Sequence, residues 1–342
     1  MKMPKGSVVL GFSGGIDSVT ATRWLLDEGY DVTALTLDTM GDEQLLRRAK
    51  ESARQIGVKH AILDVRESFQ TKIIDYFTHN YSLGRTPAPC TMCNPLIKWH
   101  YLAQYADQIG AEHIATGHYF NIERDNGCFY VTKADDRSKD QSYYLWGLSQ
   151  SVLERAITPM GHRFKEVVKR DFADKKESMG ICFLAGMSYR DYLVRHCPQV
   201  VVAGDIVNRS GEIVGRHDGV AFYTIGQKRG LDTTIAEAVI VDIDAATNRL
   251  IIGDNQDLYH AILEIKECNI VNPQELLSSK DVTVVVRGIG RNPQRYIKQV
   301  VEIEGGYRIY LDDPAWAPAV GQPVVFYRGD RVLGGGILEK FM

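Results

Sequence analysis

The sequence predicts an α/β protein in which a parallel sheet covered by helices is followed by two small β-rich, barrel-like domains. Short apolar runs alternate with amphipathic stretches over the first half of the chain, which is typical of a parallel α/β sheet. After about Val201 the runs are short, rich in β-forming residues and separated by Asp, Asn and Gly turns. The length of 342 residues fits two or three domains, which we expect at 1–200, 201–272 and 273–342.

The first half supplies the elements of the predicted parallel sheet. Apolar runs predict strands at residues 7–12, 31–37, 60–64 and 113–116. Apolar residues at helical spacing predict helices at residues 18–28, 42–56, 67–79, 96–109, 149–156, 164–172 and 189–195. The pair Asn126–Gly127 predicts a β-hairpin, because both residues tolerate the positive φ of a tight turn.

The second half supplies short strands only. They are predicted at residues 212–214, 220–225, 238–243, 249–252, 282–287, 296–303, 307–311 and 324–327. We expect the segment around Asn272–Leu277 to divide them into two β modules.

The composition is that of a folded globular protein, with 44% hydrophobic and 24% charged residues. No apolar run is long enough to span a membrane, and the start lacks the features of a signal peptide, so we expect a cytoplasmic protein. The net charge of −3 argues against a protein that coats nucleic acid without specificity. It leaves room for a local basic surface that grips one RNA.

The loop after the first strand carries a phosphate-binding pattern. Its residues are Gly11, Phe12, Ser13, Gly14, Gly15, Ile16, Asp17 and Ser18. Glycines let the backbone approach an oxyanion, the serines add hydroxyl donors, and the following helix supplies unpaired N–H groups. The alternative is a plain Ser/Gly turn in which Asp17 or Ser18 caps the helix. The string S-G-G-I-D-S resembles the PP-loop of ATP pyrophosphatases, and this resemblance implies that Asp17 helps to hold Mg²⁺ against ATP.

Two cysteines with two residues between them, Cys90 and Cys93, precede a predicted helix start at Asn94–Pro95. Cys93 would then lie just ahead of a helix N-terminus, where the dipole favours the thiolate. A structural zinc site and a thioredoxin-like dithiol remain alternatives to sulfur chemistry with a third cysteine. A structural zinc site needs four ligands, and the chain holds no second pair of this spacing.

The third cysteine is expected to be Cys182, in the segment Gly180-Ile181-Cys182-Phe183. Lys175 and Lys176 lie nearby in the sequence, and their positive charges favour a thiolate. The alternative is a small buried apolar residue between Ile181 and Phe183.

The order and spacing of these motifs resemble the tRNA-specific 2-thiouridylases (tRNA-uridine 2-sulfurtransferases) of the PP-loop ATP pyrophosphatase superfamily, over nearly the whole chain. Besides the loop and the cysteines, the matching segments are Gly84–Pro87, Ala115–Tyr119, Lys139–Tyr143, Thr224–Gly230, Gly321-Gln322 and Gly334–Ile337. The resemblance implies a Rossmann-like parallel-sheet PP-loop domain, and adenylation of the C2 oxygen of the wobble uridine by ATP. It further implies that Cys182 carries sulfur as a persulfide and that Cys93 releases it by closing a disulfide.

The resemblance also implies the remaining site residues. Residues 11–18, Leu37 and Gly117 would hold ATP. Residues meeting tRNA would be His118, Lys139, Asp140, Gln141, Arg287 and Gln322, with Ala88, Pro89 and Cys90 beside the target base. Taken alone, Lys139–Gln141 reads as a solvated turn, His118 as a satisfied core histidine and Gln322 as a turn residue. The implied partners are tRNA and a sulfur donor, which is a cysteine desulfurase, a sulfur-relay protein or free sulfide.

Cys90 stands where the family commonly has aspartate, which is a departure with chemical meaning. Three thiolates, from Cys90, Cys93 and Cys182, are the ligand set of a 4Fe–4S cluster with one open iron. Sulfur transfer through such a cluster is therefore an alternative to a persulfide. A second departure surrounds Gly288, where Arg287, Arg291 and Arg295 remain predicted phosphate contacts. For function, the alternatives are a PP-loop synthetase with a non-tRNA acceptor and a non-enzymatic RNA- or metal-binding protein.

Overall fold

The structure, a computed structural model, describes residues 5–170, 172, 180–288 and 295–342. The chain divides into two compact units. Unit 1 comprises Met1–Ile73, Cys90–Met179 and Asp330–Leu333, and unit 2 comprises Ile74–Pro89, Gly180–Gly329 and Gly334–Met342. No helix among the described residues is both long and apolar enough to cross a membrane.

Unit 1 is built on a parallel sheet of the strand order β3-β2-β1-β4-β7, which confirms the predicted α/β class. The strands are β1 Ser7–Gly11, β2 Asp31–Asp38, β3 Lys59–Asp64, β4 His113–Thr116 and β7 Ala156–Ile157. The central strand β1 is parallel to both β2 and β4, and its residues 8–10 are fully buried. Burial on both faces explains why this strand reads as a continuous apolar run.

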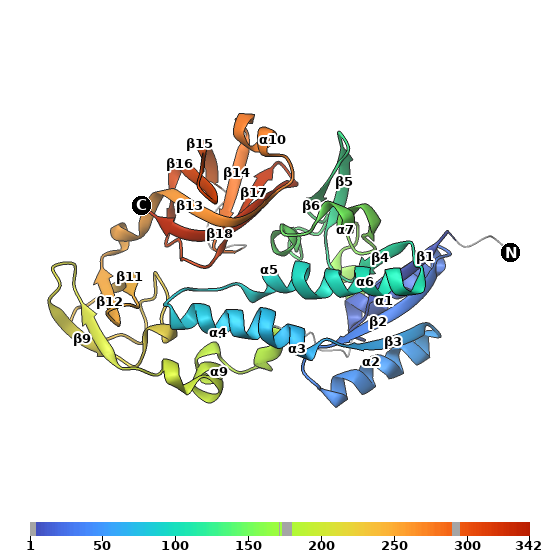
Figure 1. Cartoon of the computed structure of the whole chain (residues 1–342), viewed down its shortest axis with the longest axis horizontal. Helices are drawn as coiled ribbons and strands as arrows, with labels where there is room; N and C mark the ends of the chain where they lie inside the picture. Colours follow the sequence, from blue (N-terminus) through green and yellow to red (C-terminus); the bar gives the residue numbers. More distant parts are fainter. Residues whose placement is uncertain (1–4, 171, 173–179, 289–294) are drawn as a thin grey trace. The chain divides into compact units, whose positions relative to one another are not determined.

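Helices pack beside this sheet, with α2 next to β3 (Figure 1). The helical segments of unit 1 are α1 Ile16–Asp27, α2 Glu43–Ile56, α3 Arg66–Phe69, η1 Gln70–Ile74, α5 Pro89–Cys93, η2 Asn94–Lys98, α6 Trp99–Ile109, η3 Ser142–Leu145, α7 Gln150–Arg155 and α8 Lys165–Arg170. Local signals fix the ends of α2. The Asp42 side chain accepts hydrogen bonds from the N–H groups of Gln44 and Leu45, and Gly57 ends the helix at φ 77°.

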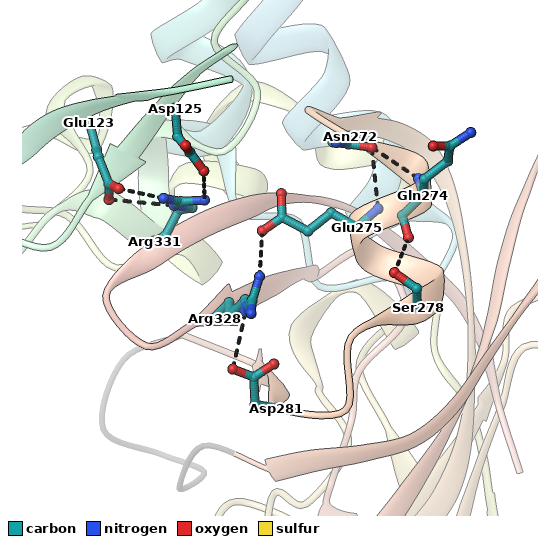
Figure 2. A network of polar contacts seen from close by, with 9 residues as sticks. All are labelled: Glu123, Asp125, Asn272, Gln274, Glu275, Ser278, Asp281, Arg328 and Arg331. Atoms are coloured by element: carbon teal, nitrogen blue, oxygen red, sulfur yellow. Dashed lines mark hydrogen bonds and ion pairs between the residues drawn. The ribbon is translucent and has the colours of Figure 1, made fainter. Parts of the chain in front are cut away.

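The predicted hairpin is confirmed as β5 Asn121–Asp125 and β6 Cys128–Thr132. Asn126 and Gly127 both have positive φ, at 48° and 80°, as a two-residue hairpin turn requires. Arg331 binds Glu123 and Asp125 of this hairpin, with 2.9 Å between its Nη1 and an Asp125 oxygen (Figure 2).

Unit 2 begins with an aromatic cluster. The helix α4 Asp75–Ser82 and the helix α9 Tyr189–His196 contribute Phe77, Tyr81, Tyr189 and Tyr192. The rings of Tyr81 and Tyr189 are stacked at 4.8 Å, and Phe183 of the short helix η4 Cys182–Leu184 packs edge-on against Phe77 at 5.0 Å.

A mixed sheet of the order β10-β9-β8-β12-β11 follows. Its strands are β8 Gly204–Val207, β9 Ile213–His217, β10 Asp232–Thr233, β11 Val239–Asp244 and β12 Arg249–Gly253, and the short helix η5 Pro198–Val200 precedes them. The strand predicted at 220–225 is wrong, because Val220–Phe222 form the 3-10 turn η6. A short apolar run indicates burial, which helices and strands share, and these three residues are buried.

The last part of unit 2 is an antiparallel barrel of six strands, β13-β16-β15-β14-β17-β18, closed by pairing of β13 with β18 (Figure 1). The strands are β13 Tyr259–Ile270, β14 Val282–Val286, β15 Arg295–Ile303, β16 Gly306–Trp316, β17 Pro323–Arg328 and β18 Arg331–Phe341, of which residues 334–341 belong to unit 2. The 3-10 turn η7 Asn255–Leu258 precedes them. Arg328 binds Glu275 at 3.2 Å and Asp281 at 3.1 Å, which fixes the helix α10 Pro273–Ser278 (Figure 2). Asn272 caps that helix.

Candidate ATP and sulfur-transfer site

The phosphate-loop residues 11–18 connect β1 to α1 at the carboxyl edge of the parallel sheet. Gly15 is the N-cap of α1 and has no side chain, so no side-chain hydrogen bond caps the first turn. The free N–H groups there, with the positive end of the helix dipole, suit a phosphate. Ligands of open α/β sheets bind at this edge.

Glycine is required at position 14 of the loop. Its φ is 70°, and a Cβ there would lie 2.9 Å from the Cα of Ala49 in α2. Phe12 is buried, and its N–H donates to the carbonyl of Leu35 at 2.8 Å. The loop is therefore anchored on one side by β2 and on the other by α2.

The loop hydroxyls lie together. Ser13 Oγ and Ser18 Oγ are 3.3 Å apart, and the Ser18 hydroxyl donates to the carbonyl of Gly15 at 3.1 Å. Ser13 is exposed and Ser18 is buried. Two hydroxyls thus face one turn of backbone, as the sequence pattern implies.

Leu37 and Gly117 lie at the same sheet edge as the loop. Leu37 is the second-last residue of β2, and Gly117 directly follows β4. A Cβ at Gly117 would lie 3.0 Å from Ser18 N and from the carbonyl carbon of Asp17. The structure thus brings the predicted ATP-binding residues of unit 1 to one edge.

Asp17 has two partners that no local sequence pattern predicts. Lys165 Nζ lies 2.6 Å from Asp17 Oδ1, and the Tyr119 hydroxyl donates to the same oxygen at 3.0 Å. The Lys165 side chain is 7% exposed, while that of Asp17 is 36% exposed. The sequence does contain a signal that Lys165 is paired. Lys165 lies on the same face of its predicted helix as apolar residues, and a buried ammonium needs an anionic partner.

The segment Lys139–Gln141 lies beside Tyr119 and makes mostly internal contacts. Asp140 Oδ1 accepts from the N–H of Ala134 at 2.9 Å, and its Oδ2 accepts from the Ser142 hydroxyl at 2.7 Å. Gln141 Oε1 accepts from the N–H of Tyr119 at 2.9 Å. The backbone N–H of Lys139 donates to the carbonyl of Asp136. These residues hold a turn next to the phosphate loop, and their predicted tRNA contacts stay predictions.

His118 is held between β4 and α6. Its Nδ1 lies 2.8 Å from the Thr116 hydroxyl, and its ring is stacked on Trp99 with 6.4 Å between ring centroids. Burial among these atoms, together with the positive charge of Lys98, lowers the pKa of His118 to about 3. The imidazole is therefore neutral at physiological pH and can donate or accept a hydrogen bond, but it offers no charge to a phosphate.

The predicted helix start at Asn94–Pro95 is wrong, because the helix begins at Pro89. Cys93 has helical angles, φ −62° and ψ −38°, and lies within the continuous run α5–η2–α6. Pro95 has no N–H for the carbonyl four residues earlier, and the helix widens to π spacing over Asn94–Lys98. Asn94 does not cap; its Nδ2 donates to the carbonyls of Cys90 at 3.1 Å and Tyr144 at 3.0 Å.

The three predicted site cysteines differ in exposure. Cys93 is 5% exposed, Cys90 is half-buried, and Cys182 is exposed. Cys182 is the first residue of η4, and the next residue, Phe183, is buried in the aromatic cluster of unit 2. The alternative of a buried apolar role for Cys182 is therefore wrong. Lys175 and Lys176 lie outside the described residues.

In unit 2, the segment that leads to Ala88 and Pro89 is fixed by Thr86. The Thr86 N–H donates to the carbonyl of Val320 at 2.8 Å, and its hydroxyl lies 2.7 Å from that of Thr224. Gln322 Nε2 donates to the carbonyl of Thr86 at 2.6 Å. Three sequence segments singled out for the family resemblance thus meet at one threonine.

Two of the predicted tRNA-binding arginines of unit 2 have internal partners. Arg287 is 8% exposed, and its Nη1 donates to the carbonyl of Ala317 at 2.8 Å. Arg295 forms an ion pair with Asp313. Arg291 lies outside the described residues.

The described residues of each unit, taken by themselves, contain no ligand set for a 4Fe–4S cluster. Among residues 5–170, 172, 180–288 and 295–342, no three His, Cys, Asp or Glu side chains are grouped so as to hold a metal ion. Cys90 and Cys93 belong to unit 1 and Cys182 to unit 2. The three-thiolate set stays a prediction.

Comparison with known proteins assigns the family. Residues 6–186 match the family model of a tRNA methyl transferase HUP domain, 190–254 a tRNA methyl transferase PRC-barrel domain, and 261–338 an aminomethyltransferase beta-barrel domain. The chain is 39% identical to tRNA-specific 2-thiouridylase MnmA 2 of Phocaeicola vulgatus, over 97% of both chains. It is 38% identical to MnmA 3 of Bacteroides fragilis, over 99% of this chain and 96% of that one. It is 34% identical to MnmA of Clostridium perfringens, over 99% of this chain and all of that protein. With its phosphate loop, its cysteines and this full-length similarity, the chain belongs to the tRNA-specific 2-thiouridylase family.

Proposed function

We propose that this protein is a tRNA-uridine 2-sulfurtransferase that uses ATP to replace the C2 oxygen of the wobble uridine by sulfur. The observation that carries the proposal is the phosphate loop at the carboxyl edge of the parallel sheet, in a chain similar to 2-thiouridylases over nearly its full length. The cytoplasmic location predicted from the sequence fits a tRNA substrate.

ATP would bind to residues 11–18, Leu37 and Gly117. The first turn of α1 and the hydroxyls of Ser13 and Ser18 then receive the phosphates. The C2 oxygen of uridine attacks the α phosphorus, the bond to the β phosphate breaks, and pyrophosphate leaves. Mg²⁺ held by a carboxylate oxygen of Asp17 would neutralise phosphate charge when bound. The adenylated oxygen can then leave as AMP, which a carbonyl oxygen cannot do.

Cys182 would bring the sulfur as a persulfide, which its exposure supports. The Cys93 thiolate attacks Cys182 Sγ, the persulfide S–S bond breaks, and hydrosulfide leaves with the electron pair while a Cys93–Cys182 disulfide forms. Hydrosulfide attacks C2 and displaces AMP. A thiol reductant then restores the two cysteines.

An iron–sulfur route is the second candidate, and Cys90 supports it. Cys90 and Cys93 are three residues apart on one helix, which places both thiols on the same face. With Cys182 they would supply three thiolates to a 4Fe–4S cluster whose open iron holds hydrosulfide. A further alternative keeps ATP chemistry and changes the acceptor, and such a synthetase has no need of Cys182.

In both routes the target base would lie beside Ala88, Pro89 and Cys90. It has to leave its stack, because C2 of a stacked base is inaccessible. The predicted tRNA contacts are His118, Lys139, Asp140, Gln141, Arg287 and Gln322.

The test is an anaerobic reaction of the full chain with ATP, Mg²⁺, sulfide and unmodified tRNA. The RNA is digested and 2-thiouridine is measured by mass spectrometry, with the iron content of the protein measured in parallel. Thiouridine that disappears when iron is removed favours the cluster. Sulfide alone cannot form a persulfide without an oxidant, so a parallel reaction uses iron-free enzyme loaded with persulfide by a cysteine desulfurase, and thiouridine made there favours the persulfide route. Absence of thiouridine from both the iron-loaded and the persulfide-loaded enzyme, on every tRNA tried, would refute the proposed function.

A further inference from the structure

Lys165 is a buried ammonium at the edge of the phosphate loop. It is 5% exposed, and its Nζ lies 2.6 Å from Asp17 Oδ1. Burying an ammonium is strongly unfavourable unless it is paired, and Asp17 supplies the pair. The pair joins residues 148 positions apart in the sequence, so it brings α8 to the first turn of α1.

The position of Lys165 is fixed by contacts on both sides. Its backbone N–H donates to Asp136 Oδ2 at 2.8 Å, which caps the start of α8. Its Nζ lies 5.7 Å from the ring centroid of Tyr119, whose hydroxyl shares Asp17 Oδ1. Tyr119 is in turn tied to Gln141. The ammonium is therefore held at one place by the backbone and by a tyrosine.

The charge balance of the loop depends on this ammonium. Asp17 lies in the first turn of α1, where the phosphates of ATP are proposed to bind. An unpaired Asp17 carboxylate would repel these phosphates, because like charges at short distance disfavour each other. Lys165 cancels this negative charge from behind, on the side away from solvent.

We infer that Lys165 is a positioning residue of the ATP site, which acts through Asp17. It fixes the orientation of the Asp17 carboxylate and neutralises it, so that the loop accepts a polyanion and its magnesium ion. The inference rests on the proposed use of ATP. It goes beyond the loop itself, because it assigns a role to a residue in a different helix.

The test compares three variants of the full chain with the wild type. Lys165→Gln removes the charge, Lys165→Arg keeps it, and Arg170→Gln removes a positive charge from the same helix. Arg170 is a matched control because it is 71% exposed and, among the residues that the structure describes, pairs across the surface with Glu166 at 3.4 Å. Pyrophosphate release is measured against ATP and against Mg²⁺, with tRNA present.

We expect Lys165→Gln to lower kcat by about 100-fold and to raise the KM for Mg²⁺–ATP about tenfold, because the Asp17 carboxylate is then neither oriented nor neutralised and repels the phosphates. Lys165→Arg should recover both quantities in part, and Arg170→Gln should match the wild type. A Lys165→Gln variant with wild-type kcat and wild-type KM would overturn the inference.

The folded fraction separates positioning from folding. Lys165→Gln should release pyrophosphate more slowly than the wild type at a temperature at which circular dichroism shows both proteins to be fully folded. If the lower rate were matched by an equal loss of folded protein, the pair would be structural and the inference wrong.

The stabilisation of each variant by Mg²⁺–ATP distinguishes failure of the inference from failure of the proposed function. A wild type that is stabilised by Mg²⁺–ATP but makes no thiouridine contradicts the tRNA activity and still allows Lys165 to be tested by that stabilisation. A wild type that is not stabilised contradicts both.

Discussion

Cys93 and Cys182, the two thiols proposed to exchange sulfur, have opposite environments. Cys93 is 5% exposed inside a continuous helical run, where a π-helical segment follows it. Cys182 is exposed at the first residue of a 3-10 turn, and the two residues after it, Phe183 and Leu184, are buried. An accessible thiol can be loaded by an external donor, and a shielded thiol is protected from unproductive oxidation. The contrast fits a carrier and a resolving cysteine.

The largest effect is expected from Cys182→Ser. Thiolation with a persulfide donor should fall at least about 10³-fold, because the variant has no sulfur atom to carry the donated sulfur. Mass spectrometry of digested tRNA measures the effect. Cys128→Ser, which changes a half-buried cysteine in β6, is the control and should retain activity. Full activity of Cys182→Ser would show that Cys182 does not carry the sulfur.

The anchor behind Cys182 gives the next effect. Phe183→Ala deletes a ring that packs against Phe77 at 5.0 Å and Tyr192 at 5.4 Å. We expect a loss of about 3–5 kcal/mol in the free energy of unfolding, measured by urea denaturation. Phe183→Leu should lose less than half as much. Equal stability of Phe183→Ala and the wild type would show that the turn is held by other contacts.

A smaller effect tests the shielding of Cys93. Asn94→Ala removes the Nδ2 group that donates to the carbonyls of Cys90 and Tyr144. We expect the free energy of unfolding to fall by about 1–3 kcal/mol. Iodoacetamide should alkylate Cys182 quickly and Cys93 slowly in the wild type. In Asn94→Ala the alkylation rate of Cys93 should rise towards that of Cys182. Peptide mass spectrometry reads both rates. An unchanged rate ratio would mean that Asn94 does not shield the cysteine.

The last prediction concerns the pH dependence of stability that arises from His118, a second group shielded from solvent. Its pKa is lowered to about 3, so the folded protein resists its protonation. The unfolded chain takes up this proton below about pH 6.5, and the stabilisation is therefore complete above that pH and decreases as the pH falls towards 3. At pH 5 the free energy of unfolding should therefore be about 2 kcal/mol lower than it is well above pH 6.5. NMR titration should show an imidazole that remains neutral down to pH 5; a midpoint near 6.5 would contradict the burial.

The sequence predicted the strand–loop–helix arrangement of residues 11–18, because glycine, serine and a helix start all lie within eight residues. Phosphate binding by this loop stays a prediction. The sequence did not predict the Lys165 partner of Asp17, since helical spacing indicates which side chain is buried but not what it meets. The helix start at Asn94–Pro95 was wrong for a local reason: proline favours first turns, and here a π-helical segment accommodates it inside a helix.

Some strands of the barrel were predicted and others were not, because a local pattern does not contain the contacts that a strand makes with distant residues. β14 and β17 are apolar runs and were predicted, whereas β18 contains Gly334–Gly336, which reads as a loop. A Cβ at Gly336 would lie 2.7 Å from Cys268 Sγ, so close strand packing requires glycine there. Such a requirement depends on a neighbour 68 residues away, which no local pattern contains.

The stack of Trp99 on His118 also gives the protein an optical reporter. Trp24, Trp99 and Trp146 belong to unit 1, and unit 2 contains only Trp316 among the four tryptophans. Intrinsic fluorescence is thus dominated by the unit with the phosphate loop. An imidazolium quenches indole emission more strongly than a neutral imidazole. Because His118 stays neutral, the emission of Trp99 should be steady across physiological pH, and a change in emission when nucleotide is added would report mainly on unit 1.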